Sequence, residues 1–156
     1  MASPDENKAL IRFLIEEALN RRNFAVAADR FTPDYTVHIP ARPDLPAGPD
    51  VFRQVIGMWH DAFDDWHMTI EQLVAEGDFV ANRFTTRGTH TGTLMGIPPT
   101  GQRMVVSSQE LHRLRDGKVA ESWIVDDVPG ILVQLGVLPA PPMAAAGGGG
   151  PPAPGG

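Results

Sequence analysis

The segment Gly117-Lys118-Val119-Ala120-Glu121-Ser122-Trp123-Ile124-Val125-Asp126-Asp127 carries the clearest structural signal in the sequence. It predicts a strand that begins at a tight Asp116-Gly117 turn, with side chains alternating between two faces. Counting by twos, one face carries Val119, Glu121, Trp123, Val125 and Asp127. A carboxyl group held among apolar and aromatic side chains is disfavoured in its charged form, which suits it to proton transfer near neutral pH. Asp127 is therefore the first candidate for a catalytic residue.

A second interpretation of Asp127 is structural. The next residues, Val128 to Gln134, predict a short helix with Pro in its first turn and Gly after its end. An Asp at this point can cap the helix, which stabilises it by about 1 kcal/mol. Asp126 points to the opposite face and could take that role instead. A shift of one residue in strand register would exchange the two side chains, so both assignments stay open.

The composition narrows the classes of function. The 156-residue chain has a formal net charge of −6 and only 13 Lys and Arg residues, which argues against a nucleic-acid partner because such proteins need a basic surface. Without cysteine there are no disulfides, thiolate nucleophiles or Cys-based zinc sites. Charged residues interrupt the N-terminal apolar segment, so we predict that it is neither a signal peptide nor a membrane span. We therefore predict a cytoplasmic location.

Motifs for metals and phosphates are missing from the sequence. The five histidines show no His-x-x-x-His pair and no ligand cluster with an acid at metal spacing; they are His38, His60, His67, His90 and His112. We therefore predict no metal site. No Gly-rich phosphate-binding loop follows a predicted strand, and there is no Gly-x-Ser-x-Gly elbow.

The order of predicted elements gives an α+β fold in one domain, residues 1–138. Hydrophobic periodicity predicts helices first: from a Ser3–Glu6 capping box to about residue 20, over 24–31, and over 50–64. Strands follow the second helix at 35–39 and then at 67–75, 79–90, 103–115 and 118–125. Residues 139–156 are rich in Pro, Gly and Ala without charges, which predicts a disordered tail.

Several short motifs in this order resemble the SnoaL-like polyketide cyclases (ester cyclases) of the NTF2-like superfamily. These motifs are Val74-Ala75-Glu76-Gly77-Asp78-Phe79-Val80-Ala81, Arg87-Gly88-Thr89-His90-Thr91-Gly92, Pro98-Pro99-Thr100-Gly101, Asp116-Gly117-Lys118, Glu121-Ser122-Trp123 and Gln134-Leu135-Gly136. Singly each is weak, but together they are specific, and they span roughly residues 5 to 138.

The resemblance implies an α+β cone, with N-terminal helices packed on a curved antiparallel sheet that encloses a pocket. It also implies a homodimer that works without a cofactor on a hydrophobic small molecule. Characterised members close a ring by intramolecular aldol condensation, in which an acidic residue moves the proton. By its position after the Glu-x-Trp strand, that residue would be Asp127.

The same family resemblance suggests other candidate site residues. His112, on the preceding strand with Glu110, would hydrogen-bond a substrate carbonyl or orient Asp127, although a lone strand histidine is also compatible with a structural role. The predicted substrate-binding residues are Tyr35, His38, Trp59, His90, Glu110 and Trp123. Two of them could instead have purely structural roles. Trp59 on the apolar stripe of a helix could be a core residue, and His90 could stabilise the conformation of its loop.

Two rival functions remain beside the cyclase. An isomerase or epoxide hydrolase could use the same cone, with water entering the product in the second case. A non-catalytic binding module could hold a small apolar molecule, because a fold does not by itself imply catalysis. In that case Asp127 would be only a helix cap.

Overall fold

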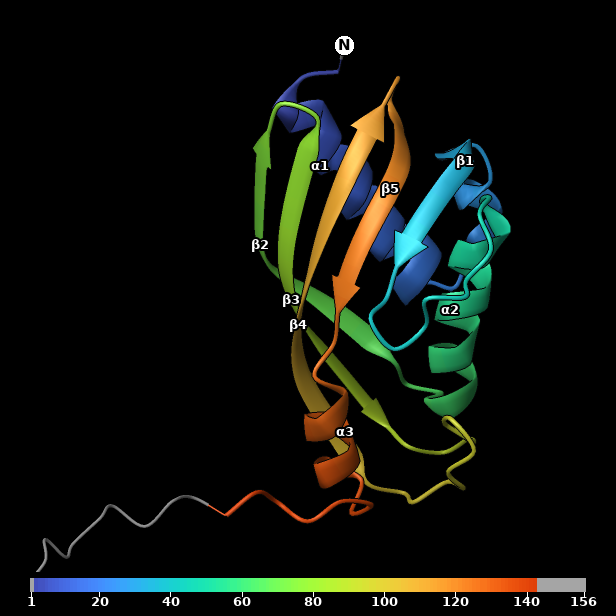
Figure 1. The fold of residues 1–156 in the computed structure, drawn as a ribbon, viewed down its shortest axis with the longest axis vertical. Helices are drawn as coiled ribbons and strands as arrows, with labels where there is room; N and C mark the ends of the chain where they lie inside the picture. Colours follow the sequence, from blue (N-terminus) through green and yellow to red (C-terminus); the bar gives the residue numbers. More distant parts are fainter. Residues whose placement is uncertain (1, 143–156) are drawn as a thin grey trace, which may run out of the picture.

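The computed structural model describes residues 2–142, and one curved five-stranded sheet is its main element (Figure 1). The strands are β1 (Phe31–His38), β2 (His67–Glu76), β3 (Phe79–Thr89), β4 (Arg103–Arg115) and β5 (Lys118–Val125). They lie in the order β1-β5-β4-β3-β2. Only β1 and β5 run parallel; the other neighbours are antiparallel. The four strands predicted after residue 66 are confirmed within one residue at each end.

The N-terminal helix follows its predicted limits but changes type midway. α1 (Pro4–Phe13) starts with the expected capping box between Ser3 and Glu6, and Pro4 occupies its first turn. It continues as η1 (Leu14–Asn20), a π-helical segment. Such segments are rare and often lie at functional sites. Here the π-helical segment supplies buried apolar side chains to the inner side of the sheet.

The region between the first two long helices differs from the prediction. The expected helix over 24–31 is only the 3-10 turn η2 (Phe24–Ala27), and β1 already begins at Phe31. Pro33 lies within this strand, and proline lacks the N–H that a central strand needs. β1 is an edge strand, however, and an edge strand tolerates proline.

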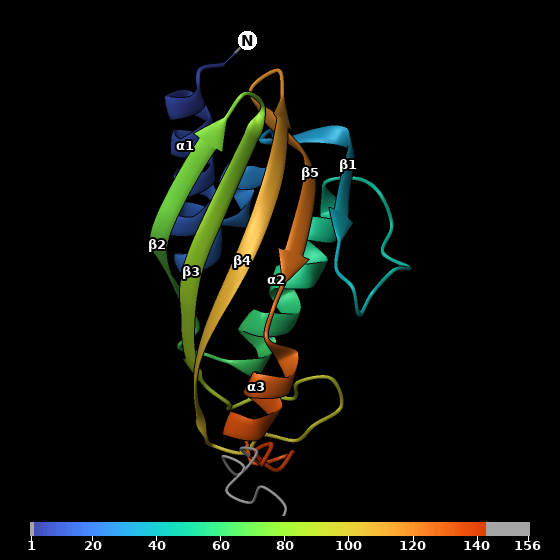
Figure 2. The same cartoon turned by 60° about the vertical axis from the view of Figure 1, so that its left-hand side comes forward.

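Two further helices complete the fold. α2 (Asp50–Ala62) lies along the concave side of the sheet near β1, and α3 (Val128–Gln134) follows β5 at the far end (Figures 1 and 2). The helices pack on a curved sheet, so the predicted α+β arrangement is confirmed. The tail prediction for 139–156 concerns residues that, from 143 onward, lie outside the described part of the chain.

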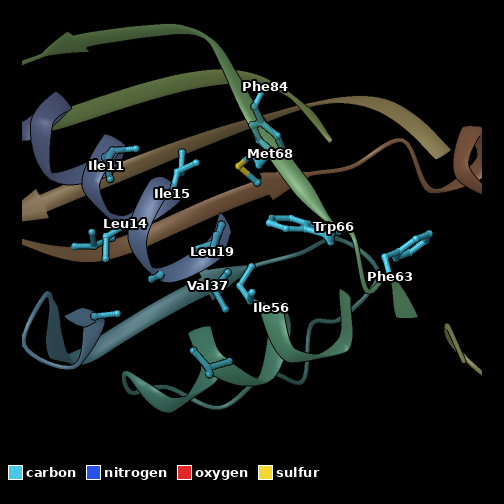
Figure 3. Packing of buried hydrophobic residues seen from close by; sticks show 14 of the residues in the cluster. Ile11, Leu14, Ile15, Leu19, Val37, Ile56, Phe63, Trp66, Met68 and Phe84 are labelled. Atoms are coloured by element: carbon cyan, nitrogen blue, oxygen red, sulfur yellow. The ribbon is translucent and has the colours of Figure 1, made fainter. Parts of the chain in front are cut away.

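The core fills the space between the sheet and the helices. Figure 3 shows Leu19 of η1 beside Val37 of β1 and Ile56 of α2. These apolar positions follow the helical and strand periodicities of the sequence. No helix within residues 2–142 is long and apolar enough to cross a membrane.

Candidate active site

Two adjoining hollows lie between the inner face of the sheet and the helices. The first encloses about 500 Å³ of non-atom space, including its open mouth, and is lined by α1, η1, β1, α2, β4 and β5. The second spans about 410 Å³ of non-atom space, its open mouth included, and lies toward α3, beside Trp59, Trp66 and Phe84. Their walls share Val55, Ile56, Glu110 and Ile124. A mostly apolar hollow with a few convergent polar groups is typical of a small-molecule site.

On β4, the directions of the polar side chains follow from simple alternation along the strand. Burial along β4 alternates without interruption over the whole strand. Ser108, Glu110 and His112 therefore point to one side, where the last two line the first hollow. The prediction that these side chains share a face is confirmed.

The polar groups of β5 do not follow simple alternation, because the strand contains a β-bulge. Val119 pairs with Leu114 and Glu121 pairs with Arg113, so Ala120 is an extra residue on β5. A bulge inserts one residue and shifts every later side chain to the other face. Val119 and Ser122, three positions apart, thus both line the first hollow, and Asp126 lines the second.

Because of this bulge, the prediction that Asp127 lies on the interior face is wrong. Asp127 is exposed and accepts a hydrogen bond at Oδ1 from the backbone N–H of Gly130, at 2.9 Å. It is the N-cap of α3. Asp126, one residue earlier, is the carboxyl group that faces the hollow. The sequence carries no signal for the bulge, since Ala120 is neither a glycine nor a turn residue.

The surroundings of Asp126 disfavour its charged form. Burial raises its pKa above the ordinary value. The Ser108 hydroxyl counteracts part of this rise, although it makes no hydrogen bond within standard geometry, and the negative charge of Glu110 adds to the rise. The result is a carboxyl group suited to exchanging a proton with a bound molecule.

A chain of hydrogen bonds crosses the inner face of the sheet beside the first hollow. The Tyr35 hydroxyl donates to Ser122 Oγ at 3.0 Å, and Ser122 Oγ lies 2.8 Å from His112 Nδ1. His112 Nε2 lies 3.1 Å from Glu110 Oε2. The Glu110 carboxylate can only accept, so His112 Nε2–H donates to it; in the neutral imidazole Nδ1 is then the acceptor, and the Ser122 hydroxyl donates to Nδ1. Burial raises the pKa of Tyr35 well above its usual range, so Tyr35 remains a neutral donor.

Glu110 is the end point of this chain. Its Oε2 also accepts a hydrogen bond from Asn82 Nδ2, at 3.1 Å. Its Oε1 accepts none from the residues that the structure describes and is not sealed from solvent. The side chain is only 9% exposed, so a free carboxylate oxygen is presented to the hollows from a fixed position.

The structure brings some of the predicted site residues together and separates others. Tyr35, Trp59, Glu110 and His112 line the hollows. The prediction that the other three line the pocket is wrong. His38 and Trp123 stack on each other on the outer face of the sheet, with ring centroids 5.3 Å apart, because Trp123 lies past the bulge. His90 is fully buried under the 91–102 loop, where Nδ1 accepts from the Thr100 N–H.

The site also contains two residues outside the set predicted for a cyclase. Ser122 links two strands through hydrogen bonds, and Asn82 holds Glu110 from β3. Ser122 belongs to the Glu121-Ser122-Trp123 motif, but the role of each residue arises only when neighbouring strands pair. Within residues 2–142, no three His, Asp or Glu side chains are arranged to hold a metal ion. The polar groups that line or support the hollows are carboxyl, hydroxyl, amide and imidazole groups.

Comparison with known proteins identifies the family of this chain. The profile of the SnoaL-like polyketide cyclases matches residues 9–135. The nogalonic acid methyl ester cyclase of Streptomyces nogalater is 31% identical over 105 residues, which are 67% of this chain and 78% of that protein.

Solved structures give the same result. AclR from Streptomyces galilaeus, proposed to be a hydroxylase, superposes with a TM-score of 0.77 at 34% identity, covering 90% of this chain and 87% of AclR. IdmH from Streptomyces antibioticus, proposed to be a polyketide cyclase, gives a TM-score of 0.73 at 32% identity over 84% of this chain and 99% of IdmH. With its α+β cone, its pocket between sheet and helices and this profile match, the chain belongs to the SnoaL-like polyketide cyclase family of enzymes.

Proposed function

We propose that this protein closes a ring in a neutral polyketide ester by intramolecular aldol addition, with Asp126 as the general base and then the general acid. The observation that carries the proposal is the position of Asp126. Its carboxyl group lies in an apolar hollow, and burial there raises its pKa. A base of this kind contributes roughly 10²–10⁴ in rate. It therefore suits a carbon acid already activated by neighbouring carbonyl groups.

The proposed reaction conserves every atom of the substrate. The Asp126 carboxylate removes a proton from a carbon between two carbonyl groups, which leaves an enolate. The enolate carbon attacks a second carbonyl carbon of the same molecule, forming a carbon–carbon bond and an alkoxide. Asp126, now protonated, returns the proton to the alkoxide. The product is an isomer of the substrate.

In this proposal His112 is a positioning residue. Both of its ring nitrogens lie at hydrogen-bonding distance from protein groups, Ser122 Oγ and Glu110 Oε2. It therefore acts through Glu110 and not by direct contact with the substrate. The predicted hydrogen bond from His112 to a substrate carbonyl is therefore not part of this proposal.

The charge of the hollows favours an uncharged substrate. Both lining sets contain Glu110, the second also contains Asp126, and neither set includes Lys or Arg. A substrate carboxylate buried here would meet like charges without a cationic partner, which is costly. The methyl ester in the name of the S. nogalater relative is neutral at that position.

The test compares nogalonic acid methyl ester with its free acid. We expect ring closure of the ester, seen by chromatography and mass spectrometry as a product of unchanged mass, with kcat/KM at least tenfold above that of the acid. Heat-denatured protein controls for spontaneous closure. Absence of any isomeric product would refute the proposal. Incorporation of labelled oxygen from water would favour the hydrolase alternative.

We further propose that the protein is a homodimer joined through the outer face of the sheet. Phe79, Leu111 and Val125 are exposed there, next to Trp123. An apolar patch of this kind is typical of a protein interface. Sedimentation should give twice the chain mass of 16.9 kDa, and Leu111→Glu should give a monomer. A wild type that remains monomeric at all concentrations would contradict the dimer.

A further inference from the structure

Glu110 has a feature that aldol chemistry at Asp126 does not use. Its side chain stands in the wall shared by the two hollows, so a molecule that spans both must pass it. A buried carboxylate normally has its oxygens satisfied by hydrogen-bond donors. Here Oε2 has two such partners and Oε1 has none among residues 2–142.

The free oxygen is held in place and is not a mobile end. Asn82 on β3 and His112 on β4 fix Oε2 from two directions, and His112 is itself held by Ser122 on β5. Since the carboxyl group is planar, fixing Oε2 also fixes the direction of Oε1. The neighbouring wall residues Val55, Ile56 and Ile124 are apolar and offer Oε1 no donor.

A carboxylate oxygen in this position can accept a hydrogen bond from a bound molecule. An ionised carboxylate accepts hydrogen bonds and cannot donate them. Ether oxygens and carbonyl groups of a substrate would be rejected beside it, whereas a hydroxyl group would be bound. Hydrogen bonds to charged groups are worth about 1.5–3 kcal/mol, and a site built for a hydroxyl discriminates strongly against an analogue that lacks it.

We propose that Glu110 is the specificity-determining residue of this site and that it accepts a hydrogen bond from a phenolic hydroxyl of an aromatic substrate. Aromatic walls suit such a molecule, since Phe52 and Tyr35 line the first hollow and Trp59 and Trp66 the second. The ring with the hydroxyl would lie at the junction, and the carbon that loses its proton would lie toward Asp126. This orientation rests on the proposed function, whereas hydroxyl recognition stands without it.

The test is a binding experiment that needs no turnover. 2-Naphthol and its methyl ether, 2-methoxynaphthalene, differ only in the donor, and both are neutral at neutral pH. Their dissociation constants can be measured by quenching of tryptophan fluorescence. We expect the wild type to bind 2-naphthol about tenfold or more tightly than the ether, which corresponds to about 1.4 kcal/mol or more. In Glu110→Gln we expect the ratio to fall to about one.

The matched control is Glu121→Gln. Glu121 is also a half-buried carboxylate on the sheet, but it lies on the outer face with His38 and Arg113, so the wild-type ratio should persist. A wild type that binds both compounds equally, or neither, overturns the proposal, as does an unchanged ratio in Glu110→Gln. Hydroxyl selection without ring closure would refute the aldol reaction alone. Ring closure with no hydroxyl selection would refute the role of Glu110 alone.

Discussion

Asp126→Asn is expected to lower the rate of ring closure by a factor of roughly 10²–10⁴ while the protein stays folded. The amide has nearly the shape of the carboxyl group, so the second hollow keeps its walls. It cannot take a proton from a carbon acid, however. Because the lost interaction forms only in the transition state, kcat should fall far more than KM rises. Single-turnover rates and equilibrium binding of the ester would separate the two effects.

The pH dependence of the wild type should carry the signature of the same group. A general base must be ionised, so kcat/KM falls as the pH drops through the pKa of Asp126. That pKa is raised, which places the acid limb of the profile above the range of ordinary aspartates. In Glu110→Gln the limb should move to lower pH, because a neutral neighbour no longer disfavours the Asp126 anion.

Asp127→Asn is the matched control for Asp126→Asn. Asparagine caps helices about as well as aspartate, and Asp127 lies outside both hollows. Its activity and thermal midpoint should therefore stay close to those of the wild type. A large loss of activity in Asp127→Asn, with full activity in Asp126→Asn, would return the catalytic role to Asp127.

Phe63→Ala should cost about 3–5 kcal/mol of unfolding free energy, a large part of the stability of a domain of this size. Phe63 is 0% exposed at the end of α2. Its ring stacks on Trp59 and packs against His90. It also fits against Gly88 so closely that a Cβ there would lie within 3.1 Å of three of its atoms. Truncation would leave a cavity in the closely packed core.

Chemical denaturation measures this cost, with Phe79→Ala as the control. Phe79 is 41% exposed on the outer face, so the same truncation should cost only about 1 kcal/mol. Phe79 lies in the proposed dimer interface, so both truncations are compared in the Leu111→Glu background, where the protein is expected to be a monomer and dimer formation does not add to apparent stability. Equal losses in the two variants would show that Phe63 does not anchor the core.

The sequence alone predicted the parts of the fold that depend on local rules. The capping box at Ser3 starts α1 where expected. The turn at Asp116-Gly117 has positive φ at both residues, 53° and 71°, which is the geometry that an Asp-Gly pair favours in a hairpin. Along β4 the alternation is regular, so the direction of Glu110 and His112 could be predicted by counting.

Which carboxyl group faces the pocket depends on how the strands pair in three dimensions. A single extra residue at Ala120 reverses the alternation of β5, and it sets Asp126 inside and Asp127 at the helix cap. Bulges arise where strand pairing must follow the curvature of a sheet, and pairing is not written in the spacing of one strand. The Tyr35–Ser122–His112–Glu110 chain is of the same kind, because it joins residues of three strands that meet only when the sheet forms.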